Sequence, residues 1–484
     1  MRKALVITAL LLVCSIGGLT AAALWVDAPR AEVVLTETVL SGDPAAAEGL
    51  EISQGTTLNN QLFWDTVLRP GASAESETAY AFTVKKTYAQ GESDYSSLQL
   101  YDHVEYGSGA FRDNGEPLGL DKVYKELYEQ SAADGQEHKR RVYLKDYYDY
   151  YPIALTFDTP DCHVQLDLYL YGYSDTEEAE PGTEAYAFQK LQDFFRIPVL
   201  EDEQMELQVS VQGNGSSYGG GSVEGSDSFD LWAYSVLTEG VCYFTFDPHT
   251  YQGNTVDLSL IPGGYGLYRL PYDPERRNED GQELCPLDMD ALEMVYPLDP
   301  SVRVIDLCTD PEKENLLLLT GEGDSCVLTV IRAETMETVQ RLVLWDDPDI
   351  SGWLYHDGGD FLLMSQSRQT EEETWERCIS LLARRADGSY ELRFTVPFEL
   401  NEKVEYFRDS GLAAAYDGER LALVYPGWGY DRNRNLRENC GLVTAVYDET
   451  GLRYLGDWQS SLNTGYSQVY SYYCRCDSLS VLWK

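Results

Sequence analysis

The chain has 484 residues, of which 81 are Asp or Glu and 36 are Lys or Arg, so its formal net charge is −45. This excess of negative charge repels phosphates, which argues against nucleic acids and anionic lipid headgroups as partners. Hydrophobic residues make up 43% and charged residues 24% of the chain, proportions that exclude a disordered protein. The 40 glycines and 36 tyrosines favour an all-β protein with many turns.

Residues 1–25 predict a cytoplasmic tip and a transmembrane anchor. Ala4 to Trp25 is a run of 22 uncharged residues preceded by Arg2 and Lys3. A membrane span needs about 20 apolar residues, whereas the apolar part of a cleaved signal has about 7 to 15. The positive pair predicts that the N-terminus stays inside and the rest is exported. We therefore expect a single-pass cell-membrane protein with an extracytoplasmic C-terminal domain, cleavage after Ala21–Ala23 being the alternative.

Residues 26–60 are small and polar, and we interpret them as a stalk or a first strand. From Gln61 onwards, short β-rich runs recur between Gly, Asp, Asn and Pro. Such runs include Thr78–Val84, Tyr143–Tyr151, His163–Tyr171, Glu206–Val211 and Tyr243–Phe246. We therefore place a single β domain at residues 61–484.

Two stretches have the apolar spacing of helices. Asp121–Ser131 places Val123, Leu127 and Tyr128 on one face. Glu184–Phe195 does the same with three residues, namely Phe188, Leu191 and Phe195. Both are predicted to be short helical insertions in the β framework.

The C-terminal half contains an internal repeat. Three apolar segments are each followed by a polar loop and a cysteine that begins a second strand. The apolar segments are Leu316–Leu319, Phe361–Met364 and Leu421–Val424. The cysteines are Cys326, Cys378 and Cys440, spaced 52 and 62 residues apart. A turn and a third strand follow each cysteine, the first turn being Ala333–Glu337.

A four-stranded antiparallel sheet every 50 to 60 residues is the unit of a β-propeller blade. The 424 residues from Gln61 to Lys484, at about 57 per blade, give seven or eight blades. We favour seven, because the helical insertions lengthen the N-terminal half. Cysteines at the same position in successive blades are too far apart to bond, so we expect no disulfide among Cys326, Cys378 and Cys440 and expect them to be buried.

The segment LTETVLSGDPAAAEGL, followed by QLFWDT at Gln61–Thr66, resembles uncharacterised single-pass extracytoplasmic proteins of anaerobic Gram-positive bacteria. The repeat in turn resembles that of β-propeller proteins. These resemblances imply a location outside the cytoplasm and a propeller fold, and they imply no activity.

The sequence contains isolated matches to catalytic and metal-binding motifs, and each has a structural interpretation. Gly215, Ser217 and Gly219 fit the G-x-S-x-G pattern, but no helical pattern follows the serine, so we interpret the segment as a loop. The five histidines have no metal-site spacing. Asp431, Asn433 and Asn435 alternate like calcium ligands but lack the required glycine and the final acid. We therefore predict no catalytic residue, metal or cofactor.

The strongest candidate binding site is the segment YPGWGYDRNRN at 425–435, interpreted as a loop between two strands of one repeat. Aromatic rings beside polar groups suit sugars or peptides, and propeller loops commonly form binding surfaces. The predicted ligand contacts are Tyr425, Trp428, Tyr430, Asp431 and Arg432. The alternative is that Trp428 only packs the loop against a neighbouring blade.

The sequence thus predicts a membrane-tethered extracytoplasmic propeller that binds a protein, peptide or glycan at the cell surface without catalysis. One alternative is a propeller glycosidase or polysaccharide lyase, which would require two carboxylates that converge on the channel mouth. Another is a structural subunit of an envelope complex.

Overall fold

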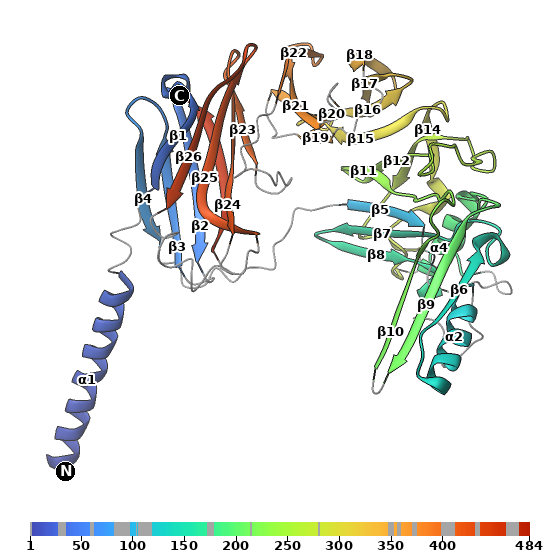
Figure 1. The fold of residues 1–484 in the computed structure, drawn as a ribbon, viewed down its shortest axis with the longest axis horizontal. Coiled ribbons are helices and arrows are strands. Elements are labelled where there is room, and N and C mark those ends of the chain that lie inside the picture. Colours follow the sequence, from blue (N-terminus) through green and yellow to red (C-terminus); the bar gives the residue numbers. More distant parts are fainter. Residues whose placement is uncertain are drawn as a thin grey trace. The chain divides into compact units, whose positions relative to one another are not determined.

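A computed structural model gives the structure of the chain. It describes residues 2–27, 35–58, 62–81, 97–102, 104, 119–171, 179–212, 215–278, 281–346, 353–355, 360–369, 375–397, 412–430, 436–460 and 474–484. The described residues are mostly strands, which confirms the all-β class (Figure 1). They form two compact units, residues 90–354 and residues 1–89 with 355–484.

The discontinuous unit joins the two ends of the chain. One of its sheets has the order β27 (Cys474–Trp483), β2 (Leu50–Leu58), β3 (Leu62–Arg69) and β4 (Glu75–Ala81). A second has the order β1 (Leu35–Gly42), β26 (Gly451–Ser460), β25 (Leu436–Asp448), β24 (Leu421–Tyr430) and β23 (Ala413–Tyr416). The third contains β20 (Phe361–Gln369), β21 (Trp375–Arg384) and β22 (Tyr390–Pro397), and its first strand β19 (Trp353–Tyr355) lies at the boundary between the two units in the chain.

The segment 35–58 is therefore built into the sheets. The strand β2 pairs along its whole length with β27, from Leu50 opposite Trp483 to Leu58 opposite Cys474. The strand β1 pairs with β26, and the 3₁₀ turn η2 (Pro44–Ala47) lies between β1 and β2. The expected domain boundary at residue 61 is thus corrected. Of the two interpretations of residues 26–60, stalk or first strand, residues 35–58 form two strands joined by η2, because the C-terminal strands supply their hydrogen-bonding partners.

The continuous unit contains four further sheets. Two are four-stranded meanders: β11 (Ala233–Thr238), β12 (Val241–Phe246), β13 (Gly266–Pro271) and β14 (Glu293–Pro297), then β15 (Arg303–Thr309), β16 (Asn315–Glu322), β17 (Ser325–Arg332) and β18 (Thr338–Asp346). Two have three strands: β5 (Ser97–Asp102), β7 (Ile153–Thr159) and β8 (Cys162–Leu166), and β10 (Gly215–Ser222), β9 (Gln204–Gln212) and β6 (His138–Tyr143).

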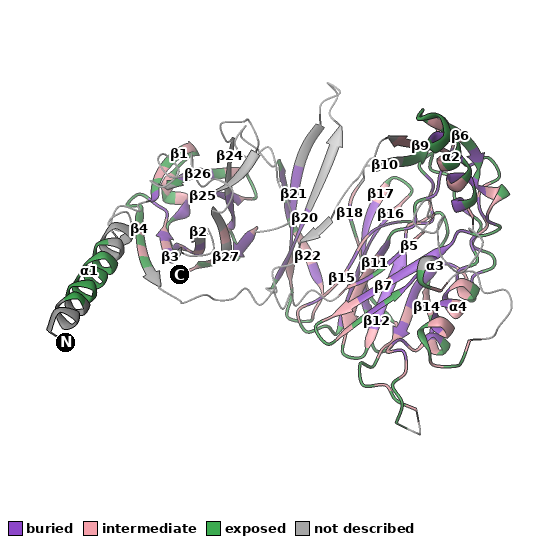
Figure 2. Ribbon diagram, turned by 90° about the horizontal axis from the view of Figure 1, so that it is seen from below, coloured by how far each residue is buried: buried purple, intermediate pink, exposed green. Residues whose placement is uncertain are grey.

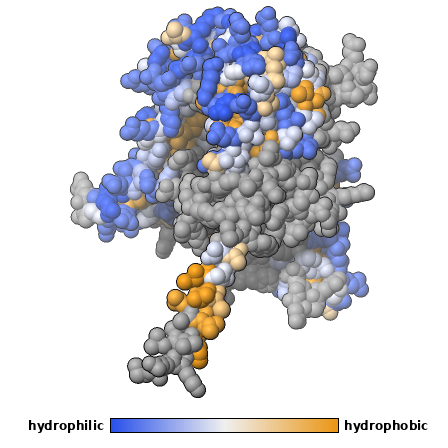
Figure 3. Space-filling view, turned by 90° about the vertical axis from the view of Figure 1, so that its left-hand side faces the viewer, coloured by the Kyte–Doolittle hydropathy of each residue, from blue (hydrophilic) through white to orange (hydrophobic). Residues whose placement is uncertain are grey.

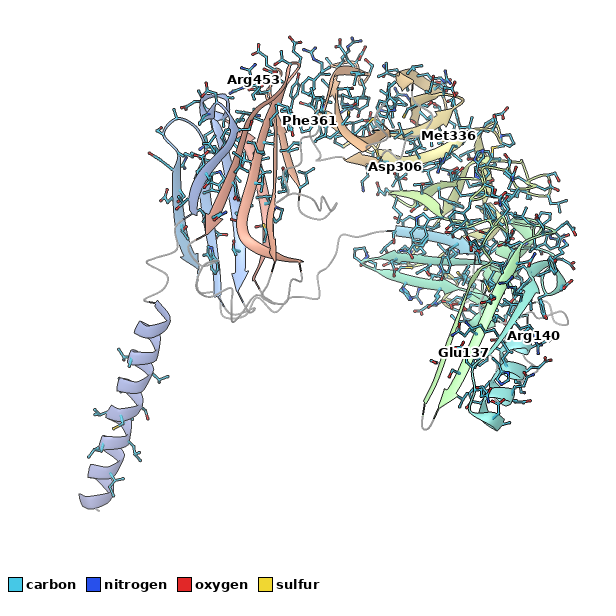
Figure 4. All side chains as sticks on the ribbon, in the orientation of Figure 1. Glu137, Arg140, Asp306, Met336, Phe361 and Arg453 are labelled. Carbon is cyan, nitrogen blue, oxygen red and sulfur yellow. The ribbon has the colours of Figure 1, made fainter. Side chains whose placement is uncertain are left out.

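The predicted repeat is confirmed as three successive blade-like meanders. Its apolar segments lie in β16, β20 and β24, and its cysteines lie in β17, β21 and β25. Cys326 is a buried free thiol, so it is not bonded to either of the other two, and Cys378 is buried. The first turn also matches the prediction, because Met336 lies between β17 and β18 with φ 57° (Figure 4).

The blade number is not confirmed. Among the described residues, six sheets follow the chain order expected of blades, while β10, β9 and β6 form a separate sheet. That sheet carries the predicted helix α2 (Asp121–Asp134), which buries Val123 and Leu127 against it. Arg140 of β6, labelled in Figure 4, pairs with Glu126 of α2. The insertion therefore contains a sheet of its own in addition to the predicted helix.

The second predicted helix is also confirmed as α4 (Glu184–Phe194), which begins at the Thr183 N-cap. Two predicted strands are wrong in part. The run 143–151 contains only the end of β6 and the 3₁₀ turn η3 (Leu144–Asp146), and 163–171 ends in the short helix α3 (Leu168–Tyr171). Both runs have high β propensity, but in the first run Tyr148 and Tyr151 are buried in the core while Tyr143 and Tyr150 are exposed, so the run does not alternate as a strand would.

Among the described residues of the continuous unit, a large hydrophobic core receives side chains from its four sheets and from α4, and Figure 2 shows the buried residues in purple. The first strands of three successive sheets lie side by side, since β11 packs against both β5 and β15. The hydroxyl of Ser235 in β11 donates to the carbonyl of Leu98 in β5 at 2.8 Å and accepts from the amide of Leu98 at 3.1 Å. Adjacent first strands are the arrangement that surrounds the axis of a propeller.

The first helix, α1 (Arg2–Asp27), is a single continuous element. Its described apolar side chains are exposed, and Figure 3 shows them in orange. Within the residues that the structure describes, no helix reaches the combined length and hydropathy of a membrane span.

Candidate functional site

The described part of the segment 425–435 is strand rather than loop. Residues 425–430 lie in β24, where Trp428 is opposite Glu438 of β25. The side chain of Tyr425 is only 7% exposed and packs in the core of its unit, so it does not line a surface site. The side chains of Trp428 and Tyr430, and all of Asp431 and Arg432, lie outside the described residues. Their predicted ligand contacts therefore stay predictions.

The G-x-S-x-G match is also a strand. The strand β10 pairs with β9 in unbroken register from Gly215 to Ser222, so the expected loop is corrected. The serine has neither the strand-to-helix turn nor a nearby histidine among the described residues lining its shallow pocket. No cluster of metal-ligating side chains occurs in the part of the chain that the structure describes.

A pocket of about 350 Å³ lies at one end of the sheet that starts with β11. Ala233 of β11 is opposite Phe246 of β12, so the residue before β11 and the residue after β12 are brought to the same end. These residues are Trp232 and Asp247. The first residue of β15, Arg303, reaches the same place, because β15 packs beside β11.

Asp247 is the polar centre of this pocket. One of its carboxylate oxygens is 2.6 Å from Nδ1 of His249, and the other accepts a hydrogen bond of 3.1 Å from Nε of Arg303. The side chains of Asp247 and His249 are mostly buried, whereas that of Arg303 is exposed. The carboxylate therefore fixes a guanidinium group that still has donors directed to solvent.

Two aromatic rings form the rim. Trp232 is 60% exposed and Tyr251 is 75% exposed, both unusual for residues of this size. The Tyr251 hydroxyl donates to Asp230 at 3.0 Å, which fixes the ring. These rings thus present flat apolar faces to solvent beside charged groups.

The turn that carries Tyr251 is hydrogen-bonded to the buried side chain of Asp227. Its carboxylate accepts hydrogen bonds from the Thr250 hydroxyl at 2.7 Å, the Asn254 amide group at 2.9 Å and the Gln252 backbone N–H at 3.1 Å. Burial alone would raise the pKa of Asp227, but these hydrogen bonds outweigh it and lower that pKa. The exposed ring of Tyr251 is therefore mounted on a rigid turn.

Tyr234 lines the inner wall of the pocket. Burial is the main cause that raises the pKa of its phenol, and the negative charges of Asp247 and Asp306 add to it. Asp306 lies on β15, close to where Arg303 begins that strand (Figure 4). The phenol of Tyr234 thus remains protonated and able to donate a hydrogen bond.

Sequence reasoning missed this site. A signal for it exists in FDLWAYS at 229–235, where the alternation predicts that Trp232 and Leu231 point to opposite faces. A second signal is Asp247, an acidic residue two positions before His249. Neither signal joins the two segments to each other or to Arg303, which is more than 50 residues further along the chain.

The comparisons with known proteins identify no family for this chain. No protein-family profile matches the chain, and no curated protein matches it. Among solved structures, it is similar to the β-propeller domain of Cps50 (Swd1) from Myceliophthora thermophila, with 12% identity, 63% of this chain and 92% of that chain covered, and a TM-score of 0.22.

Two enzymes are also matched. A post-proline cleaving enzyme from Rickettsia typhi has 8% identity over 89% of this chain and 47% of its own, with a TM-score of 0.21. The catalytic domain of the GH62 α-L-arabinofuranosidase from Coprinopsis cinerea has 9% identity over 54% of this chain and 88% of its own, also with a TM-score of 0.21. At such scores the fold assignment depends on the sheet topology and not on these matches.

Proposed function

We propose that the protein is a membrane-tethered, extracytoplasmic propeller that binds a ligand through the pocket of Trp232, Asp247 and Arg303. The observation that carries this proposal is the pair of exposed rings, Trp232 and Tyr251, beside a fixed carboxylate–guanidinium pair. Exposing two large aromatic rings at one place costs hydration free energy that a ligand can recover. No step of catalysis is needed to explain the arrangement.

The test compares ligand binding by three proteins, each the full chain in a detergent without a sugar headgroup. Trp232→Ala removes one ring of the pocket, and Tyr143→Ala is the matched control because Tyr143 is an exposed tyrosine elsewhere in the same unit. Polysaccharide and peptide fractions of the host envelope are titrated by calorimetry. We expect heat of binding for the wild type and Tyr143→Ala, and at least a several-fold weaker response for Trp232→Ala. Equal heats of binding for all three proteins would refute the proposal that the ligand binds in this pocket.

The membrane tether is supported by Ala4–Trp25, which has 22 uncharged residues after Arg2 and Lys3, and by the exposed apolar side chains of α1. A periplasmic-type or secreted reporter fused after Lys484 should be active only when the C-terminus is exported. Deletion of residues 4–25 is the control, and it should abolish reporter activity. Reporter activity that survives this deletion, or a chain released into the medium, would contradict the anchor.

A hydrolytic role is the second candidate, because Asp230 and Asp247 line the same pocket. In this arrangement Asp247 is paired with Arg303 and Asp230 accepts from Tyr251, so neither is placed as a protonated general acid. Release of reducing sugar from envelope polysaccharide by the wild type, and its loss in Asp247→Asn, would favour the enzyme over the binding module.

A further inference from the structure

We infer that the ligand of this pocket is a neutral saccharide, an inference that depends on the proposed binding function. The pocket combines three kinds of group. Trp232 and Tyr251 offer flat apolar faces, Asp247 offers acceptor oxygens, and Arg303 offers donors. A sugar ring has an apolar face with C–H groups and an edge of hydroxyls, each of which both donates and accepts.

The charges of the pocket argue against an anionic ligand. Two carboxylates, Asp230 and Asp247, face one guanidinium, and the whole chain carries −45. A phosphate, sulfate or uronate would have to approach through this field, and Arg303 is the one Lys or Arg among the described residues that line the pocket. Acidic polysaccharides are therefore excluded as the preferred ligand.

A cationic peptide is disfavoured by the same contacts. The Asp247 carboxylate already holds Arg303 and lies against His249, and the guanidinium is exposed on the pocket side, where it would repel an ammonium group. A neutral ligand avoids this repulsion. Two neighbouring sugar hydroxyls can donate to Asp247 and accept from Arg303 while the ring stacks on Trp232.

The backbone and the buried hydrogen bonds around the pocket hold its binding groups in fixed positions. Asp227 fixes the turn of Tyr251, and the strand pairing of β11 and β12 fixes Trp232 relative to Asp247. Preorganised groups lose little conformational entropy on binding, which is the requirement for recognising a flexible, strongly hydrated ligand. The pocket of about 350 Å³ accommodates one or two sugar units and leaves the rest of a glycan chain in solvent.

The test uses the full chain in a detergent without a sugar headgroup on an array of neutral, acidic and amino-sugar glycans, with hexalysine and hexagalacturonate as charged probes in solution. We expect binding to one or more neutral glycans. Trp232→Ala should weaken it about tenfold and Arg303→Ala several-fold, while Tyr143→Ala leaves it unchanged. Unchanged melting temperatures of the variants establish that they are folded.

Absence of binding to every neutral glycan, or binding that Trp232→Ala does not weaken, overturns the saccharide assignment. Binding of hexalysine that requires Trp232 would overturn the saccharide assignment and leave the binding pocket in place. The proposed binding function is tested separately by the calorimetric titrations. It is refuted if neither the polysaccharide nor the peptide fraction gives a heat of binding that Trp232→Ala weakens.

Discussion

Glu203 is a carboxyl group inside the core of the continuous unit, only 5% exposed. Its carboxylate accepts a hydrogen bond from the hydroxyl of Tyr151, which is also buried. Burial is the main cause that raises the pKa of Glu203 to about 7, and the negative charge of Asp102 adds to the rise, while the hydrogen bond from Tyr151 opposes it. The core therefore contains an acid that titrates near neutral pH.

The direction of the pH effect follows from this raised pKa. The folded protein holds the Glu203 proton more tightly than the unfolded chain, whose pKa is near 4.5. The cost of ionising Glu203 in the fold is therefore absent below about pH 4.5, grows as the pH rises to about 7, and is constant above that.

Glu203→Gln removes this cost and keeps an oxygen that accepts from Tyr151. We expect the melting temperature of Glu203→Gln, relative to the wild type, to be higher at pH 8 than at pH 5. The matched control is Glu206→Gln, which removes an exposed partner of Arg141 whose hydrogen bond lowers the Glu206 pKa. Since Glu206 is charged at both pH values, its substitution should have the same small effect at each. A relative stability of Glu203→Gln that is independent of pH would contradict the argument.

At the scale of elements, the C-terminal strand β27 connects two sheets of the discontinuous unit. It is hydrogen-bonded to β2, and the indole Nε1 of Trp483 donates to the carbonyl of Ala415 in β23 at 3.1 Å. The guanidinium of Arg420 lies 4.0 Å from the centre of the Trp483 ring and donates to the carbonyl of Ala46. The Trp483 side chain thus contacts β23 and Arg420, and Arg420 in turn is hydrogen-bonded to Ala46 in the N-terminal segment.

Trp483→Ala removes the packing, the cation–π contact and the hydrogen bond together, and we expect it to destabilise this unit by about 2 kcal/mol. Trp483→Phe retains a ring and loses the hydrogen bond, so its loss should be roughly half as large. Urea unfolding followed by circular dichroism measures both variants. Trp232→Ala is the control, because that ring is exposed and its removal should change the unfolding free energy little. Equal losses for Trp483→Ala and Trp483→Phe would show that ring packing contributes nothing.

At the scale of the whole molecule, the excess of acids is the dominant electrostatic feature. Against 81 acidic residues the chain has 36 Lys and Arg, so at least 45 carboxylates have no Lys or Arg to neutralise them. The ion pairs of the described residues lie mostly at the surface, where each contributes about 1 kcal/mol or less. Added salt weakens both the repulsion among the acidic residues and the attraction within these ion pairs. Since the repulsion is the larger of the two, salt should stabilise the folded protein.

We accordingly expect the melting temperature at pH 7.5 to rise by several degrees between 20 and 500 mM NaCl, in roughly the range where screening becomes effective. The control is the same pair of measurements at pH 4.5, where part of the carboxylates is protonated and the rise should be smaller. Differential scanning calorimetry records both. A melting temperature that falls with salt at pH 7.5 would mean that the ion pairs dominate.

The sequence by itself determined those features of the fold that depend on local pattern, namely individual helices and strands. Apolar spacing indicated α2 and α4, and the recurring repeat indicated three strands of each meander, namely β16–β18, β20–β22 and β24–β26, because hydrophobic period and turn chemistry act over a few residues. The fold class follows from the same signals.

Only the tertiary structure decided which distant segments meet. The pairing of β1 with β26 and of β2 with β27 depends on segments more than 400 residues apart, and it decided between the two interpretations of this region, stalk or strand, in favour of strands in 35–58. Tyr425 is in the core because β24 continues past it. The candidate pocket joins Trp232, Asp247 and Arg303 from three strand ends, and no local pattern encodes such a meeting, because backbone pairing and core packing between distant segments determine it.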